Sequence, residues 1–82
     1  MVTVDYSPSF GKTIQKIRDR LFKEKVSKQI RKIVACSEIG KPMRHARKGT
    51  REVYIPPFRL SYCYIPSENK IIFLDLYHKD TQ

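Results

Sequence analysis

The side chains best suited to catalysis lie in the last third of the sequence, where Arg59 occupies an alternating apolar segment and His78 precedes Lys79. A guanidinium presents a planar, permanently charged fork to phosphate oxygens. Imidazole and ammonium groups can move protons or stabilise charge. RNA can be cut without a metal when its own 2′-OH attacks the adjacent phosphate, provided that the protein assists proton transfer and stabilises charge on phosphorus. These residues therefore indicate a phosphodiester as the candidate target.

Each of these residues also has a purely structural interpretation. Arg59 could be a surface charge paired with Glu52, which is the more common situation for a strand arginine. A single histidine at the end of a strand, such as His78, is more often structural than catalytic, and His45 has the same status. The sequence alone leaves both interpretations open.

Other classes of site lack the residues that they need. The glycines, Gly11, Gly40 and Gly49, are scattered, so ATP- and NAD-binding loops are absent. No acidic cluster is spaced to hold magnesium, which argues against a two-metal nuclease. Cys36 and Cys63 have no further ligands nearby, so we expect free, buried or half-buried thiols and no zinc site. We therefore expect neither a metal nor a cofactor.

The charge balance points to a polyanionic partner. Lys and Arg number 17 against 8 Asp and Glu, which gives a net charge of +9 and a pI near 9.8. Nucleic acid is the leading partner, with an acidic membrane surface or an acidic protein as alternatives. Tyr77 and Tyr54 could stack on unpaired bases. The densest positive segment contains Lys41, Arg44, Arg47, Lys48 and Arg51.

Length and hydropathy limit the architecture. The chain of 82 residues and 9.7 kDa is predicted to form one domain, residues 1–82, with a thin core. No apolar run approaches the roughly 20 residues that span a bilayer, so no membrane association through a spanning helix is expected. The N-terminal segment has no secretory signal, which favours a soluble, cytoplasmic protein.

The N-terminal half predicts one strand and two amphipathic helices. Alternation over residues 2–6 is typical of a strand, after which Ser7 and Pro8 form a helix start. The first apolar stripe is Phe10, Ile14, Ile17 and Leu21. The second is Val26, Ile30, Ile33 and Val34. Gly40 with the following proline is expected to end this helical hairpin.

The C-terminal part predicts the rest of an antiparallel sheet. Three further strands are expected, at 52–55, 58–64 and 71–76. The order β-α-α-β-β-β indicates an α+β fold, with the helix hairpin on one face of the sheet and Arg59 on the other. The pattern leaves open whether His78 or Lys79 lies on the Arg59 face, because that depends on the strand register.

Three segments resemble toxins of the RelE/ParE superfamily, especially the RelE and YoeB type. They are GKPMRHARKG (40–49), REVYIPPFRLSYCYI (51–65) and IIFLDLYHKD (71–80). This resemblance covers about half of the chain, and the strand and helices before it agree in type. It implies a microbial RNase fold that cleaves mRNA in the ribosomal A site and is silenced by an acidic, helix-containing antitoxin, with which it could form a heterotetramer.

The resemblance also implies roles for individual residues. Arg59 corresponds to the arginine that contacts the scissile phosphate, and Arg44 to the basic residue of the G-K-P-L-R element. His78 and Lys79 correspond to the final pair, of which YoeB-like members use the histidine and RelE-like members the cation. No cofactor is implied.

The sequence departs from the RelE pattern at two places. Glu52 and Tyr54 stand where lysines are expected, so Glu52 is either a base or a partner of Arg59. The expected tyrosine after the final pair is also absent. Two alternatives therefore remain, a ParE-like toxin that inhibits DNA gyrase by binding, and a basic RNA-binding domain without catalytic activity.

Overall fold

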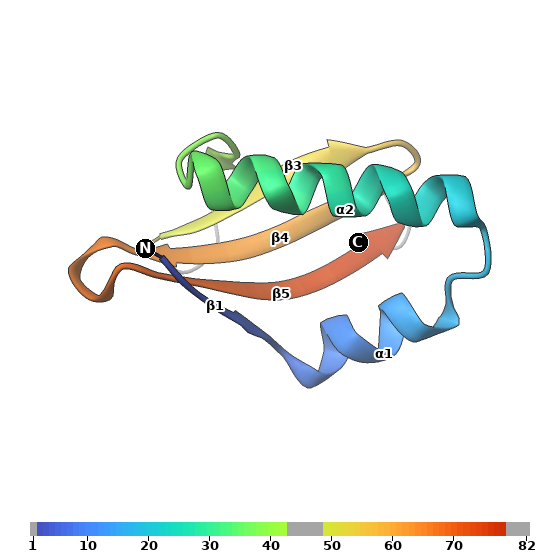
Figure 1. Ribbon diagram of the computed structural model, residues 1–82, viewed down its shortest axis with the longest axis horizontal. Coiled ribbons are helices and arrows are strands. Elements are labelled where there is room, and N and C mark those ends of the chain that lie inside the picture. Colours follow the sequence, from blue (N-terminus) through green and yellow to red (C-terminus); the bar gives the residue numbers. More distant parts are fainter. Residues whose placement is uncertain (1, 43–48, 79–82) are drawn as a thin grey trace.

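The computed structural model describes residues 2–42 and 49–78 (Figure 1). A strand and two helices precede the remaining strands, as expected from the sequence, and a two-residue strand and a short 3-10 helix are added. The elements are β1 (Thr3–Tyr6), α1 (Pro8–Lys16), α2 (Arg20–Ala35), β2 (Lys41–Pro42), β3 (Thr50–Ile55), β4 (Phe58–Ile65), η1 (Pro66–Glu68) and β5 (Lys70–His78).

The strands form one mixed sheet in the order β1-β5-β4-β3-β2. All neighbouring strands are antiparallel except β1, which lies parallel to β5 and pairs Val4 with Ile71. The α+β class and the helix-covered face are confirmed, but the expectation of a wholly antiparallel sheet is corrected at this edge. Alternation of apolar residues shows which face a side chain occupies and carries no information on strand direction.

Local hydrogen bonds explain where the helices begin. The Ser7 side chain accepts from the backbone N–H of Phe10, and Pro8 takes the first helical position of α1. The Asp19 carboxylate accepts from the first backbone N–H groups of α2. This second cap separates the helices, so Leu21 lies at the start of α2 and is 69% exposed. The prediction that Leu21 continues the apolar stripe of the first helix was wrong.

The core lies between the two helices and one face of the sheet. Figure 1 shows α2 crossing the sheet along β3 and β4 while α1 lies near β5 and β1. Phe22, Val26 and Ile33 of α2 are buried there, and Phe10 of α1 is buried too. The sheet contributes Ile55, Leu60, Tyr62, Ile71, Phe73 and Leu76. The tyrosine at 62 is thus a core residue, as predicted.

Gly40 allows the backbone before β2 to lie against Tyr62 of β4, and it does not end a helix as the sequence predicted. Helix α2 already ends at Ala35. The Tyr62 hydroxyl donates to the Ser37 carbonyl at 2.9 Å and accepts from the Gly40 N–H at 2.9 Å. A Cβ on Gly40 would lie 2.8 Å from the Tyr62 oxygen, which leaves no space for a side chain. Burial raises the pKa of the Tyr62 phenol above its ordinary value of 10.0.

A β-bulge interrupts the pairing of β4 with β5. Tyr62 pairs with Phe73, but the preceding residue of β4, Ser61, pairs with Asp75, so that Leu74 has no partner residue in β4. A bulge residue shifts the alternation of every side chain that follows it in its strand. The bulge therefore decides which residues at the end of β5 face each side of the sheet.

The two cysteines differ in their exposure. Neither cysteine forms a disulfide; Cys63 is half-buried as expected, but Cys36 is exposed. Among residues 2–42 and 49–78, no helix is long and apolar enough to cross a bilayer. The same ranges contain no group of three His, Cys, Asp or Glu residues that could hold a metal ion.

Candidate functional site

Three polar side chains meet on the face of the sheet opposite the helices. Leu60 in β4 is buried on the helix-covered side, so the alternation of the strand places Arg59 on the other side. Arg59 pairs with Tyr54 of β3 and with Tyr77 of β5, which aligns these three residues across the sheet. Glu52 lies two residues before Tyr54 on the same face.

A carboxylate links this cluster, which we call the Glu52–Arg59–Tyr77 cluster. The Arg59 guanidinium lies 3.3 Å from one oxygen of Glu52, in an ion pair and hydrogen bond. The Tyr77 hydroxyl donates to the other oxygen at 3.0 Å. The side chains of Arg59 and Glu52 are 30% and 23% exposed, so solvent and a ligand can reach them.

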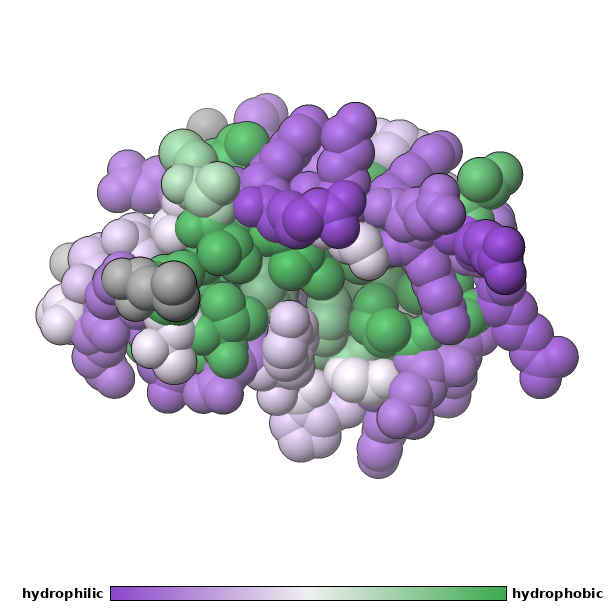
Figure 2. Space-filling view, viewed as in Figure 1, coloured by the Kyte–Doolittle hydropathy of each residue, from purple (hydrophilic) through white to green (hydrophobic). Residues whose placement is uncertain are grey.

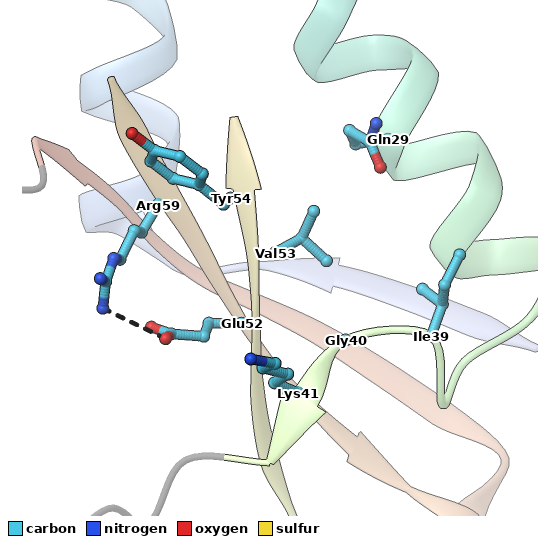
Figure 3. A pocket seen from close by; sticks show the side chains of 8 residues that line it. All are labelled: Gln29, Ile39, Gly40, Lys41, Glu52, Val53, Tyr54 and Arg59. Carbon is cyan, nitrogen blue, oxygen red and sulfur yellow. Dashed lines mark hydrogen bonds and ion pairs between the residues drawn. The ribbon is translucent and has the colours of Figure 1, made fainter. Parts of the chain in front are cut away.

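A hollow of about 430 Å³ lies beside the cluster at the edge of β3. Figure 3 shows Glu52 and Arg59 on one side of β3, with Val53 directed toward α2 on the other. Lys41 pairs with Glu52 in the sheet, which brings a second cation to this edge. The lining residues are Gln29, Ile39, Gly40, Lys41, Glu52, Val53, Tyr54 and Arg59.

His78 lies on the opposite face from Arg59. It pairs with Phe58, and its ring is 5.4 Å from the Phe58 ring in an edge-on contact. Phe58 in turn packs against Phe22 of α2 at 5.0 Å, which identifies this as the helix-covered side. The sequence left the face of His78 open, and the structure places it away from Arg59, so the two residues do not share a cleft. The bulge at Leu74 causes this, because it reverses the alternation before the strand ends.

The predicted basic residues divide into two groups. Arg51 donates to the backbone carbonyls of Glu38 and Gly40 at 3.1 and 2.8 Å, so its guanidinium secures the segment that follows α2. Lys41 is exposed at the edge of the sheet. The remaining predicted site residues lie outside the described residues, and they are Arg44, Arg47, Lys48 and Lys79.

The sequence identified Arg59 and its pairing with Glu52 but missed the contribution of Tyr77. Stacking of Tyr77 on a base stays a prediction, and the structure adds that its hydroxyl donates to the Glu52 carboxylate. The two residues are 25 positions apart in the chain, and only the bulge brings them to one face. A base, a cation and a hydroxyl donor thus occur together, which is a set suited to acid–base chemistry at a phosphate.

Comparison with known proteins supports a toxin. Residues 4–82 match the family described as ParE toxin of type II toxin-antitoxin system, parDE. The chain belongs to this ParE toxin family. The RelE/ParE resemblance seen in the sequence is therefore confirmed, and the chain is a toxin of a type II toxin–antitoxin system. No curated protein matches the chain.

Solved structures share the fold of this ParE-family toxin. Escherichia coli RelE, in the RelBE toxin–antitoxin complex, has 12% identity and a TM-score of 0.81, covering 95% of this chain and 96% of RelE. The YoeB/ParE toxin from Agrobacterium tumefaciens has 14% identity and a TM-score of 0.81, with 94% and 98% covered. The RelBE2 complex from Mycobacterium tuberculosis includes a chain with 20% identity and a TM-score of 0.77, with 95% and 98% covered.

The toxin also carries an apolar groove between its two helices, with a volume of about 500 Å³. Figure 2 shows hydrophobic residues gathered along the middle of this face, with hydrophilic residues on both sides. Tyr6 is 55% exposed, although its ring stacks on Phe10 and Phe73. The groove is lined by Tyr6, Phe10, Gly11, Ile14, Gln15, Lys23, Val26, Ser27 and Ile30.

Proposed function

We propose that this toxin is a metal-independent endoribonuclease that cleaves mRNA in the ribosomal A site. The observation that supports this most directly is the Glu52–Arg59–Tyr77 cluster, in which the carboxylate and the guanidinium line an accessible hollow and the phenol donates to the carboxylate. These groups match the demands of 2′-OH attack, namely a proton acceptor and donors that stabilise charge on the phosphate.

In this proposal Arg59 binds the non-bridging oxygens of the scissile phosphate and stabilises the extra negative charge that forms during attack. Glu52 accepts the proton of the 2′-OH once the phosphate has taken its place at the guanidinium. Lys79 donates a proton to the departing 5′-oxygen, or Arg44 stabilises its negative charge until water protonates it. His78 does not contact the phosphate in this proposal, because it lies on the other face of the sheet beside Phe58.

Ribosome and mRNA binding follow from the charge of the chain. The net charge of +9 favours ribosomal RNA as a docking surface. We assign the electrostatic contacts to the exposed Lys41 and to Arg47 and Lys48, whereas Arg51 serves mainly to hold the backbone.

The decisive experiment is to identify the ends of the RNA products. Purified toxin is incubated with programmed ribosomes, and the mRNA fragments are examined by mass spectrometry. Attack by the 2′-OH leaves a 2′,3′-cyclic phosphate on the upstream fragment. Intact mRNA, or fragments with 5′-phosphate and 3′-OH ends, would contradict the proposed mechanism.

A second candidate is inhibition of DNA gyrase by binding alone. The family match to ParE toxins favours it, and so does the separation of His78 from Arg59. A supercoiling assay with purified gyrase distinguishes the two functions. Inhibition that persists in an Arg59→Ala variant would support the binding function and exclude a phosphate-directed role of the arginine.

We propose that the cognate antitoxin inserts an acidic amphipathic helix into the groove between α1 and α2. The groove needs an apolar partner face, because Tyr6 is 55% exposed and Ile14 and Ile30 are only partly buried. The groove favours a negatively charged partner, since Lys23 lines it and α1, which forms one of its walls, contains no acidic residue.

A further inference from the structure

The Glu52 carboxylate is held as a bound anion would be. One of its oxygens faces the Arg59 guanidinium and the other accepts from the Tyr77 hydroxyl. The two donors come from β4 and β5, whereas the carboxylate comes from β3. We propose that Arg59 and Tyr77 together form a binding site for a single phosphodiester, and that Glu52 occupies this site in the free protein.

The geometry of the donors suits a phosphodiester. Arg59 and Tyr77 are direct cross-strand partners, so their side chains project from the same face at a fixed separation of about 5 Å between Cβ atoms. A phosphodiester shares one negative charge between two non-bridging oxygens, as a carboxylate does. The same pair of donors can therefore accept either group, one oxygen on the guanidinium and one on the hydroxyl.

Glu52 can leave while the donors stay in place. Its backbone belongs to β3, and the partial exposure of its side chain gives it room to rotate toward solvent. Arg59 and Tyr77 are fixed by continuous pairing of β4 with β5 on their own side of the bulge. Binding of RNA is then an exchange of one anion for another, after which the displaced carboxylate is next to the bound ribose-phosphate.

The exchange of Glu52 for a phosphodiester predicts changes in phosphodiester affinity that a general attraction between charges does not. Removing the Glu52 charge should strengthen binding, because the competitor is lost. Removing the hydroxyl of Tyr77 should weaken it. The inference rests on the proposed function only in naming RNA as the source of the phosphodiester.

The test measures binding of a 2′-O-methyl dinucleotide to the full chain by titration calorimetry. This probe contains one phosphodiester and lacks the attacking hydroxyl, so its affinity is independent of cleavage. Glu52→Gln should raise the affinity about tenfold, and adding Tyr77→Phe should lower the affinity of that variant about fivefold. Glu24→Gln is the control, since it makes the same change in net charge at an exposed position of α2.

Equal affinities for the wild type and Glu52→Gln would overturn the self-occupied site, as would an equal gain in Glu24→Gln. If Tyr77→Phe left the dinucleotide affinity of Glu52→Gln unchanged, Tyr77 would not belong to the proposed site. Thermal unfolding of each variant verifies the fold, and Arg59→Lys provides a further variant that should abolish the tenfold gain. The expected affinities without any RNA cleavage would contradict the proposed nuclease while supporting the site.

Discussion

Arg59 is restrained by Glu52 on the face opposite the helices, where it contributes little to the core. Its loss should therefore affect function more than stability. Replacement by alanine removes the donor that stabilises charge on phosphorus, and we expect cleavage on the ribosome to fall by about 100-fold to 1,000-fold. Primer extension on programmed ribosomes measures this loss.

The exposed Arg31 of α2 provides a matched control for that variant, because Arg31→Ala removes the same charge far from the cluster. Cleavage by Arg31→Ala should stay close to that of the wild type. Circular dichroism and antitoxin binding should be unchanged in both variants. Full activity of Arg59→Ala would exclude the arginine from the mechanism.

The hydroxyl of Tyr62 should contribute to stability through its two hydrogen bonds. Tyr62→Phe leaves the Gly40 N–H and the Ser37 carbonyl without this partner, which should lower the free energy of unfolding by about 1 to 3 kcal/mol. Urea denaturation at neutral pH measures the change. Tyr64→Phe serves as a control, since that tyrosine is only half-buried on the same strand.

Ionisation of Tyr62 should lower the free energy of unfolding at alkaline pH. Its pKa is raised above 10.0 in the folded protein, so above that pH the unfolded state holds fewer protons than the folded state. The free energy of unfolding should therefore fall as the pH rises above about 10 and be insensitive to this group below it. In Tyr62→Phe, the part of this fall in the free energy of unfolding that comes from Tyr62 should be absent. If the fall is the same in the variant and the wild type, other groups cause it.

At the scale of the elements, two glycines should respond oppositely to alanine. Gly11 lies inside α1, where an added Cβ would contact nothing within 4 Å, so Gly11→Ala should stabilise the fold by roughly 0.5 to 1 kcal/mol. Gly40→Ala should destabilise it, because the added carbon would clash with Tyr62. Thermal unfolding of the two variants tests the pair, and shifts of the same sign would contradict this account.

Sequence patterns predicted most of the elements because capping residues and apolar periodicity act locally. Ser7 with Pro8 marks a helix start, and alternation placed Arg59 on the uncovered face correctly. The bulge at Leu74 depends on how two strands fit together, and no local pattern reveals it. The face on which His78 lies was left open by the sequence for that reason.

For the molecule as a whole, the groove between the helices should be the surface through which the antitoxin acts. Gly11 lines it and has space above it, so Gly11→Leu should fill the groove without disturbing the fold. We expect antitoxin affinity to fall by at least about tenfold, because a buried apolar contact is replaced by a steric block. Calorimetry with the cognate antitoxin measures this change.

Gly11→Ala is the control for the groove, since its methyl group is too small to fill it. Cleavage or gyrase inhibition by free Gly11→Leu toxin should remain at the wild-type level, because the groove and the Glu52–Arg59–Tyr77 cluster lie on opposite faces of the sheet. Unchanged affinity of Gly11→Leu for the antitoxin would place the docking surface elsewhere.

The register of β5 after the bulge at Leu74 decides which side chain faces Arg59. Beyond it, Tyr77 faces Arg59 and His78 faces away. One extra codon inserted between Leu76 and Tyr77 would reverse that choice and turn the imidazole toward the guanidinium, while every residue earlier in the strand kept its place. A change of length by one residue, with no substitution in the core, could thus convert a phenol-based centre into a histidine-based one during evolution.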